Sequence, residues 1–306
     1  MEDDVPEYPD DYRSGYVALI GEPNVGKSTL MNAIMGAQIS IVTRKPQTTR
    51  TMVLGIFNSD EAQILFLDTP GLISPKYLLQ KAMMQAAEQA IADADIILHI
   101  ADLPKLHKYE YKVDERLVAL LRESGKPCLA ALNKQDRVAD AEKKEARNAL
   151  ESTGVFKAIH PISALLNEGI DPLLDELVTL LPVHPPYFPP EHLSDRPERF
   201  FVSEIIREKI FEKYKQEIPY STEVVVVDFK EKKDVDYIAA DIIVEKESQR
   251  KIVIGAKGAA IKDIGTKARA DIEKFLGRKV YLELHVKYRE GWRNDKNWIK
   301  RFGYGE

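Results

Sequence analysis

The sequence predicts two successive domains: an α/β domain with a mainly parallel sheet covered by helices on both faces, and a smaller α+β domain. Short apolar runs alternate with helical stretches between residues 16 and 181, and the order of elements changes after residue 199. A proline-rich stretch separates the two patterns. Apolar strands bounded by helices are typical of parallel sheets that are buried on both faces.

The first domain, predicted over residues 15–182, is built on β-rich runs: YVALI, QILFLDT, DIILHIAD, PCLAALNK and KAIHPISA. Stretches with helical spacing of apolar side chains lie between them. The run TMVLGIF is separated from AQILFL by NSDE, which predicts an antiparallel hairpin at the sheet edge. Residues 1–14 are acidic and proline-bearing, unlike a signal peptide, so we expect a flexible tail on a cytoplasmic protein.

The second domain is predicted over residues 200–287, after a linker at residues 183–199. Six prolines fall between residues 182 and 199 and favour an extended, semi-rigid backbone. The elements that follow come in the order α-β-β-α-α-β, and the last two helices are joined by a glycine turn. Residues 288–306 form a predicted basic and aromatic tail.

The composition excludes several classes of protein. With 306 residues, of which 44% are hydrophobic, the chain can bury two ordinary cores. No apolar run approaches the ~20 residues of a membrane span. Cys128 is the single cysteine, so it has no disulfide partner within the chain, and the six histidines show no metal-ligand spacing.

The charge is distributed unevenly along the chain. Residues 1–195 carry 19 basic against 29 acidic side chains, whereas residues 246–301 carry 16 against 7. A basic segment on an acidic body favours a polyanionic partner for the C-terminal part, although a solvated lysine-rich surface explains it equally well.

The stretch GEPNVGKST, residues 21–29, follows the first β-rich run and opens a helix. It fits the phosphate-loop pattern G-x-x-x-x-G-K-S. The glycines let backbone N–H groups point at phosphate oxygens, and the helix N-terminus adds its dipole. Lys27 places a positive charge beside the β- and γ-phosphates, and Ser28 offers a hydroxyl to Mg²⁺. The predicted nucleotide contacts here are Gly21, Glu22, Pro23, Asn24, Val25, Gly26, Lys27, Ser28 and Thr29.

The base is predicted from NKQD, residues 133–136, which follows a β-rich run. The Asp136 carboxylate can accept two hydrogen bonds from guanine, whereas adenine offers no such donor pair on that edge. SAL, residues 163–165, follows the last run, and the Ala164 N–H is predicted to meet the guanine carbonyl oxygen. The predicted base contacts are Asn133, Lys134, Gln135, Asp136, Ser163, Ala164 and Leu165.

The metal is predicted from DTPGL, residues 68–72, and from TRKPQTTR, residues 43–50. Asp68 can hold Mg²⁺ directly or through water, and the Gly71 N–H can meet the γ-phosphate, with Thr69, Pro70 and Leu72 beside them. A threonine of the second segment should complete the Mg²⁺ shell. Thr48 and Thr49 both qualify, and Thr49 joins Ser28 and Asp68 in the predicted metal set.

Taken in order, GEPNVGKS, QTTR, DTPGL, NKQD and SAL resemble the motifs of translation-factor-related GTPases, the group of the Era and Der families and the tRNA-modification GTPases. The resemblance implies hydrolysis of GTP to GDP, with Lys27, Thr49 and Asn24 as catalytic residues. In this group an asparagine at the place of Asn24 can bind K⁺, although Asn24 can equally serve only to shape the turn. Leu72 stands where a Ras-like protein carries its water-orienting glutamine, so we expect slow turnover without a partner.

A second glycine turn, GAKG at residues 255–258, lies between two helices inside the basic segment. The order of elements around it resembles a type II KH domain, whose GxxG loop clamps single-stranded nucleic acid. The resemblance implies RNA contacts at Ile254, Gly255, Ala256, Lys257, Gly258, Ile261 and Lys262. In the tail, Trp292, Arg293, Trp298 and Arg301 suit base stacking with phosphate contacts, although a packed C-terminal helix explains them as well.

A GTPase domain followed by a KH domain resembles the Era family across residues 13–304. This implies binding near the 3′ end of 16S rRNA, assistance in 30S subunit assembly, a cytoplasmic monomer and peripheral membrane contact. Glu22 departs from the arginine frequent in such loops and adds negative charge near the phosphates. Two alternatives stay open: an RNA chaperone that uses GTP structurally, and a tRNA-modification GTPase, whose C-terminal cysteine is missing here. A Der-type protein would need a second phosphate loop.

Overall fold

The structure is a computed structural model that describes residues 8–43 and 45–305. Its contacts divide the chain into two compact units. Unit 1 comprises Met1–Ile39, Met52–Leu72 and Ala87–Asp195, and unit 2 comprises Ser40–Thr51, Ile73–Ala86 and Arg196–Glu306. Two segments of the predicted GTPase domain, residues 40–51 and 73–86, therefore pack with the C-terminal unit, which the sequence did not predict.

Unit 1 is built on a six-stranded sheet with the order β2-β3-β1-β4-β5-β6. All neighbouring strands are parallel except β2 and β3, which form the predicted antiparallel hairpin. The strands are β1 (Arg13–Ile20), β2 (Val53–Asn58), β3 (Ala62–Asp68), β4 (Ile96–Asp102), β5 (Cys128–Asn133) and β6 (Ala158–Pro161). The predicted fold class of this part is confirmed.

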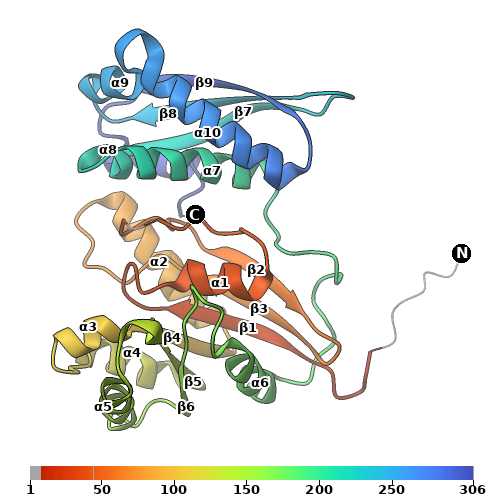
Figure 1. The fold of residues 1–306 in the computed structure, drawn as a ribbon, viewed down its shortest axis with the longest axis vertical. Helices are drawn as coiled ribbons and strands as arrows, with labels where there is room; N and C mark the ends of the chain where they lie inside the picture. Colours follow the sequence, from red (N-terminus) through yellow and green to blue (C-terminus); the bar gives the residue numbers. More distant parts are fainter. Residues whose placement is uncertain (1–7, 44, 306) are drawn as a thin grey trace, which may run out of the picture. The chain divides into compact units, whose positions relative to one another are not determined.

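Helices lie on both faces of that sheet (Figure 1). They are α1 (Lys27–Met35), α2 (Leu78–Asp93), α3 (Leu103–Lys108), α4 (Glu115–Ser124), α5 (Asp140–Glu151) and α6 (Ile170–Leu180). Consecutive residues Val17–Ile20 of β1 are all fully buried, because a parallel strand between two helix layers has no solvent-facing side. The sequence did not predict α3, which Asp102 caps by accepting a hydrogen bond from the Lys105 N–H at 3.0 Å.

The two ends of the predicted first domain are held in unit 1. Of the predicted tail, residues 1–7 lie outside the described residues, whereas Tyr12 is buried and β1 already begins at Arg13. The linker is fixed through Gln63. The Gln63 amide accepts from the Tyr187 N–H at 2.7 Å and donates to the Phe188 carbonyl at 2.8 Å. The Leu193 carbonyl accepts from Ile56 of β2 at 3.0 Å.

Unit 2 contains a three-stranded sheet in the order β7-β8-β9, with β7 antiparallel and β9 parallel to β8. Its elements are α7 (Glu198–Lys213), α8 (Glu217–Tyr220), β7 (Thr222–Lys230), β8 (Asp236–Val244), α9 (Glu247–Ile254), α10 (Ala259–Leu276), β9 (Val280–Tyr288) and α11 (Lys296–Arg301). Apart from the single turn α8, this is the predicted α-β-β-α-α-β order followed by a short C-terminal helix.

The core of unit 2 explains that order. Alternate residues of β8 point at the helices and are almost fully buried, among them Ile238, Ala240 and Ile242. Val202 and Ile206 of α7 and Ile264 and Ile272 of α10 pack against them. Within residues 8–43 and 45–305, no helix is long and apolar enough to cross a membrane.

Candidate nucleotide and RNA sites

The phosphate loop joins β1 to α1 at the carboxyl edge of the unit 1 sheet, where open α/β sheets bind ligands. Its conformation requires glycine at Gly26, which has a φ of 105°. A Cβ at this position would lie 2.2 Å from Nδ2 of Asn133, so any side chain would collide with the guanine motif. The same close approach brings Gly71 against the loop, because a Cβ there would lie 2.6 Å from the Pro23 nitrogen.

Lys27 lies in the centre of this loop. It is 6% exposed, and its Nζ donates to the carbonyls of Gly21 at 3.0 Å and Glu22 at 3.1 Å. Burial lowers the pKa of Lys27 to about 8, and the Asp68 carboxylate opposes that shift. The ammonium is therefore held where an anionic ligand would favour its charged form.

Ser28 and Asp68 are brought together from different elements. The Ser28 hydroxyl at the start of α1 donates to Oδ2 of Asp68, at the end of β3, over 2.7 Å. Next to Asp68, the buried Thr69 hydroxyl donates to the Leu19 carbonyl at 2.7 Å and fixes the turn. A carboxylate and a hydroxyl at hydrogen-bond distance are oxygen donors that Mg²⁺ takes, so these residues fit the predicted metal.

Thr48 and Thr49 belong to unit 2, so the structure does not place either predicted threonine in the unit that holds Ser28 and Asp68. Thr48 is buried, and its hydroxyl donates to the Lys45 carbonyl at 3.2 Å. Which of the two threonines reaches the metal stays open.

Asn133 ties three loops together, which the sequence did not predict. Its Nδ2 donates to the Val25 carbonyl at 2.8 Å, and its Oδ1 accepts from the N–H groups of Lys134 at 2.8 Å and Ala164 at 2.9 Å. The Ala164 N–H, predicted to meet guanine, therefore bonds to Asn133 here. This amide links the phosphate loop to both base motifs.

Asp136 is oriented by a hydrogen bond from the Ser163 hydroxyl to Oδ1, at 2.6 Å. Its other oxygen lies 3.7 Å from Nε of Arg137. Lys134 adopts a left-handed φ of 68°, and its Nζ donates to the Asn24 carbonyl at 2.9 Å. The carboxylate and the lysine stem thus come from one turn that is bonded to the phosphate loop, as a base pocket requires.

The remaining predicted contacts differ in exposure. Thr29 and Pro70 lie within the two phosphate-side motifs, and the Gln135 N–H donates to the Ile162 carbonyl at 3.0 Å. Leu165 is 69% exposed, which leaves it at the surface of the base motif.

Two charged residues near the loops were not predicted as partners. Asp102, at the end of β4, forms an ion pair with Lys134, and Lys105 of α3 forms one with Glu22. The Glu22 charge is therefore compensated by a neighbouring lysine. An aspartate that closes a β-rich run, as in DIILHIAD, was the signal available for the first pair.

The GAKG turn joins α9 to α10 in unit 2. Gly255, Lys257 and Gly258 all have positive φ, at 74°, 49° and 78°. Ala256 and the side chains of Lys257 and Lys262 are exposed, and Ile254 and Ile261 are half-buried. Ile252 is 51% exposed on the same helix as Ile254 and was not predicted. The turn offers exposed backbone, two cations and apolar surface together.

The two tryptophans of the tail differ in burial. Trp292 is fully buried, its Nε1 donates to the Ser221 carbonyl at 3.0 Å, and Arg293 Nε donates to Glu245 at 3.0 Å. The prediction that Trp292 stacks on RNA is not met in this arrangement, because its ring lies in a core with Leu79 and Met83 of α2. Trp298 is half-buried between the guanidinium groups of Arg289 and Arg301, at 5.4 and 5.0 Å from its ring.

Comparison with known proteins gives two family matches. Residues 16–134 match the family described as 50S ribosome-binding GTPase, and residues 217–293 match the KH domain.

Curated relatives match over nearly the whole chain. A protein of Zea mays named "GTPase ERA1, chloroplastic" is 45% identical over 96% of this chain and 71% of its own length. The GTPase Era of Syntrophus aciditrophicus is 44% identical over 96% of both chains.

Among solved structures, Era in complex with MgGDPNP and nucleotides 1506–1542 of 16S ribosomal RNA aligns with a TM-score of 0.91. It is 36% identical and is covered completely, with 96% of this chain aligned. A point variant of Aquifex aeolicus Era bound to GDP.AlF4⁻ aligns with a TM-score of 0.89 and 37% identity over 96% of this chain and 100% of its own.

Proposed function

This chain belongs to the Era family of GTPases, and from that premise we propose that it is a GTP-hydrolysing switch that binds 16S rRNA. One observation carries the nucleotide part. Asn133 joins the phosphate loop to the two base motifs, so Lys27 and Asp136 are held in one rigid arrangement. Calorimetry with Mg²⁺ tests it: GTP should bind and ATP should not, and equal binding of both would refute the assignment.

The Lys27 ammonium, the Ser28 hydroxyl and the Asp68 carboxylate supply the groups that this proposal needs for hydrolysis. On nucleotide binding, the Lys27 ammonium exchanges the Gly21 and Glu22 carbonyls for phosphate oxygens. Ser28 and Asp68 would hold Mg²⁺, which when bound would supply positive charge beside the leaving phosphate. Loop N–H groups at the N-terminus of α1 add fixed dipoles. No glutamine follows Gly71, so unaided turnover is slow.

K⁺ is a further expectation at Asn24. This residue has a φ of 66° and its carbonyl is held by Lys134, which fixes the turn that would present oxygen atoms to a cation. Hydrolysis should be faster in K⁺ than in Na⁺ at equal ionic strength. Equal rates would leave Asn24 with the role of shaping the turn.

The RNA part of the proposal rests on the GAKG turn and the relative solved with nucleotides 1506–1542 of 16S rRNA. We expect this chain to bind the same 3′ region and to assist 30S assembly. Gly258→Asp adds negative charge where a Cβ meets nothing within 4 Å. Gly277→Asp is the matched control, because Gly277 caps the other end of α10 with a φ of 67° and equal space. Crosslinking to rRNA in extract should be lost only in the first variant.

Hydrolysis separates this function from an RNA chaperone that binds GTP without using it. Leu72 keeps that alternative open. In a single-turnover assay with rRNA fragments, phosphate release above the buffer rate supports the switch, and its absence supports the chaperone. A cytoplasmic monomer with peripheral membrane contact is expected from the family resemblance alone. Sedimentation of the purified chain with and without vesicles tests the monomeric state and the membrane contact.

A further inference from the structure

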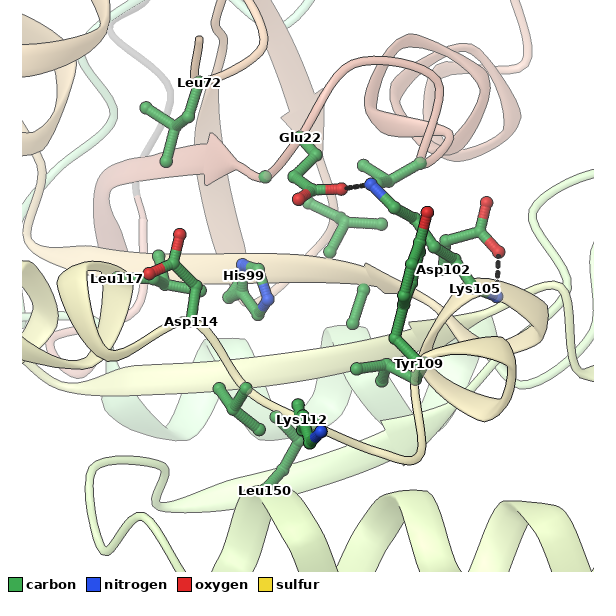
Figure 2. A pocket seen from close by; sticks show the side chains of 16 residues that line it. Glu22, Leu72, His99, Asp102, Lys105, Tyr109, Lys112, Asp114, Leu117 and Leu150 are labelled. Atoms are coloured by element: carbon green, nitrogen blue, oxygen red, sulfur yellow. Dashed lines mark hydrogen bonds and ion pairs between the residues drawn. The ribbon is translucent and has the colours of Figure 1, made fainter. Parts of the chain in front are cut away.

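Unit 1 contains a cavity of about 560 Å³ beside the phosphate loop. It lies between Gly21 and Glu22 of the loop, Leu72, the end of β4, α3 and the segment that leads into α4 (Figure 2). Its lining, drawn from the described part of the chain, includes neither Lys27 nor Ser28 nor any residue of NKQD. Four of the predicted nucleotide contacts, Gly21, Glu22, Val25 and Leu72, form one wall of the cavity. The rest of its lining comes from β4, α3, the segment before α4, and Leu117 and Leu150, away from Lys27, Ser28 and the base motifs.

The interior of the cavity is apolar and its charges are compensated within the protein. Side chains of Val25, Ile100, Leu106, Leu117 and Leu150 form much of the lining. The charged residues that line it are Glu22, Asp102, Lys105, Lys112 and Asp114. Glu22 pairs with Lys105, Asp102 with Lys134, and Lys112 with Glu110, while Asp114 caps α4. A ligand gains little from a net charge here, so the lining favours a neutral molecule.

His99 on β4 is the exception. It is 7% exposed, lines the cavity, and its Nδ1 is buried without a hydrogen-bond partner among the described residues. Burial, with the nearby charge of Lys27, lowers the pKa of His99 to about 4, so the ring is neutral at pH 7. The Ile20 backbone raises that pKa, as a carbonyl that accepts from the ring does, and because Nδ1 has no partner in the described part of the chain this contact is made by Nε2. We assign the proton of the neutral ring to Nε2 on this geometry. Nδ1 is thus an acceptor.

A buried hydrogen-bond acceptor normally has a donor as its partner. The His99 ring is held in place by stacking on Phe156, with ring centroids 5.9 Å apart. We propose that this cavity binds a small neutral aromatic molecule that donates one hydrogen bond to Nδ1 of His99, of the class of phenols and indoles. Tyr109, 55% exposed at the rim, adds an aromatic face. An occupant would also touch Gly21 and Leu72, which are joined by a backbone hydrogen bond of 3.1 Å.

The test compares phenol with toluene, which has nearly the same shape and lacks the donor. Both are titrated by NMR into the full chain saturated with GDP and Mg²⁺ and labelled with ¹⁵N in its histidines. Phenol should bind about fivefold to tenfold more tightly than toluene, the value of one hydrogen bond. The Nδ1 resonance of His99 should shift with phenol alone. Equal affinities, an unmoved His99 resonance, or no binding of phenol would each overturn the proposal, since water would then satisfy the ring.

Variants locate the binding. Leu106→Trp fills the cavity and should abolish phenol binding, whereas Val235→Trp, on an exposed loop of unit 2, should leave it unchanged. His99→Phe should bind phenol and toluene equally. If His99→Phe does not fold, the preference of the unaltered chain for phenol over toluene still decides. Displacement of phenol by GDP would place it in the nucleotide site and contradict the proposal.

Discussion

The phosphate loop and the threonine-bearing segment 40–51 make an instructive pair. Both bear predicted ligands of one nucleotide–Mg²⁺ complex, but they are held in different ways. The loop is fixed inside unit 1 by Asn133 and Lys134. The segment packs in unit 2. Predicted ligands that are held by separate packing units can form a complete set in one state and an incomplete set in another.

Arg50 is the anchor of that segment. It is buried, its Nη1 donates to the Thr222 carbonyl at 2.8 Å and to Glu223 at 2.9 Å, and its Nη2 donates to the Pro219 carbonyl at 3.0 Å. The same Glu223 carboxylate accepts from the Tyr304 hydroxyl. The motif QTTR is therefore held to α8 and β7 of unit 2 by its last residue. We hypothesise that this anchor couples nucleotide state to RNA affinity.

The largest effect is expected in unit 1, where the phosphate loop and the base motifs are bonded together. Asp136→Asn should reduce GTP affinity about 10⁴-fold, because guanine donors would face an amide N–H, and should move preference toward xanthosine triphosphate. Ser163→Ala, which removes only the orienting bond, should cost far less. Calorimetry with both nucleotides measures this; retained GTP selectivity in Asp136→Asn would contradict the base assignment.

Arg50, the anchor of segment 40–51, should give the next largest effect. Arg50→Met leaves Glu223 buried without its cation and should lower the free energy of unfolding by about 3–5 kcal/mol. Arg116→Met, at an exposed arginine, should change it little. Adding Glu223→Gln to Arg50→Met should recover part of the loss. Chemical denaturation of the three variants measures these differences.

The same variant tests the route between the sites. Where the unaltered chain binds rRNA with different affinity in GDP and in a non-hydrolysable GTP analogue, Arg50→Met should bind equally in both. A difference that survives in Arg50→Met would exclude this anchor as the connection.

The two tryptophans of the tail separate packing from RNA contact. Trp292→Ala should cost about 3–5 kcal/mol of stability, as for a buried aromatic. Trp298→Ala, at a half-buried ring, should cost clearly less stability than Trp292→Ala and weaken RNA binding by about 1–3 kcal/mol, the worth of one stacked base. Thermal unfolding and RNA titration of both variants distinguish the roles. A stable Trp292→Ala with lost RNA binding would reverse the assignment.

The smallest expected effect is the uptake of a proton by Lys27 when GDP binds. Since the pKa of Lys27 is about 8 in the nucleotide-free chain and an anionic phosphate raises it, GDP binding should take up a fraction of a proton between pH 8 and 10. The same shift predicts that the nucleotide-free chain gains stability as pH rises from 8 toward 10.5, because the unfolded chain then binds more protons than the folded one. Calorimetry in buffers of different ionisation enthalpy measures the uptake, and Lys27→Met should show none.

Local motifs predicted the fold class, the hairpin and the nucleotide loops, because these depend on strand-turn-helix patterns within about ten residues. Contacts between distant residues were not predictable. Glu223 lies 173 residues from Arg50, and nothing in QTTR indicates a buried carboxylate as its partner. In the same way, alternating aromatic and basic residues predict an exposed tail equally for Trp292 and Trp298, although the first is fully buried beside α2 residues and the second is half-buried against the same cluster.

The attachment of the linker to Gln63 has a consequence for assembly on RNA. The Leu193 carbonyl and the Ser194 hydroxyl are both bonded to β2, and α7 begins at Glu198. The backbone from Ser194 to Glu198 spans at most about 14 Å. So short a linker would keep the GTPase part at an effective concentration of the order of millimolar around any RNA that the KH domain binds. With a much longer linker, the GTPase part would meet that RNA at a lower effective concentration.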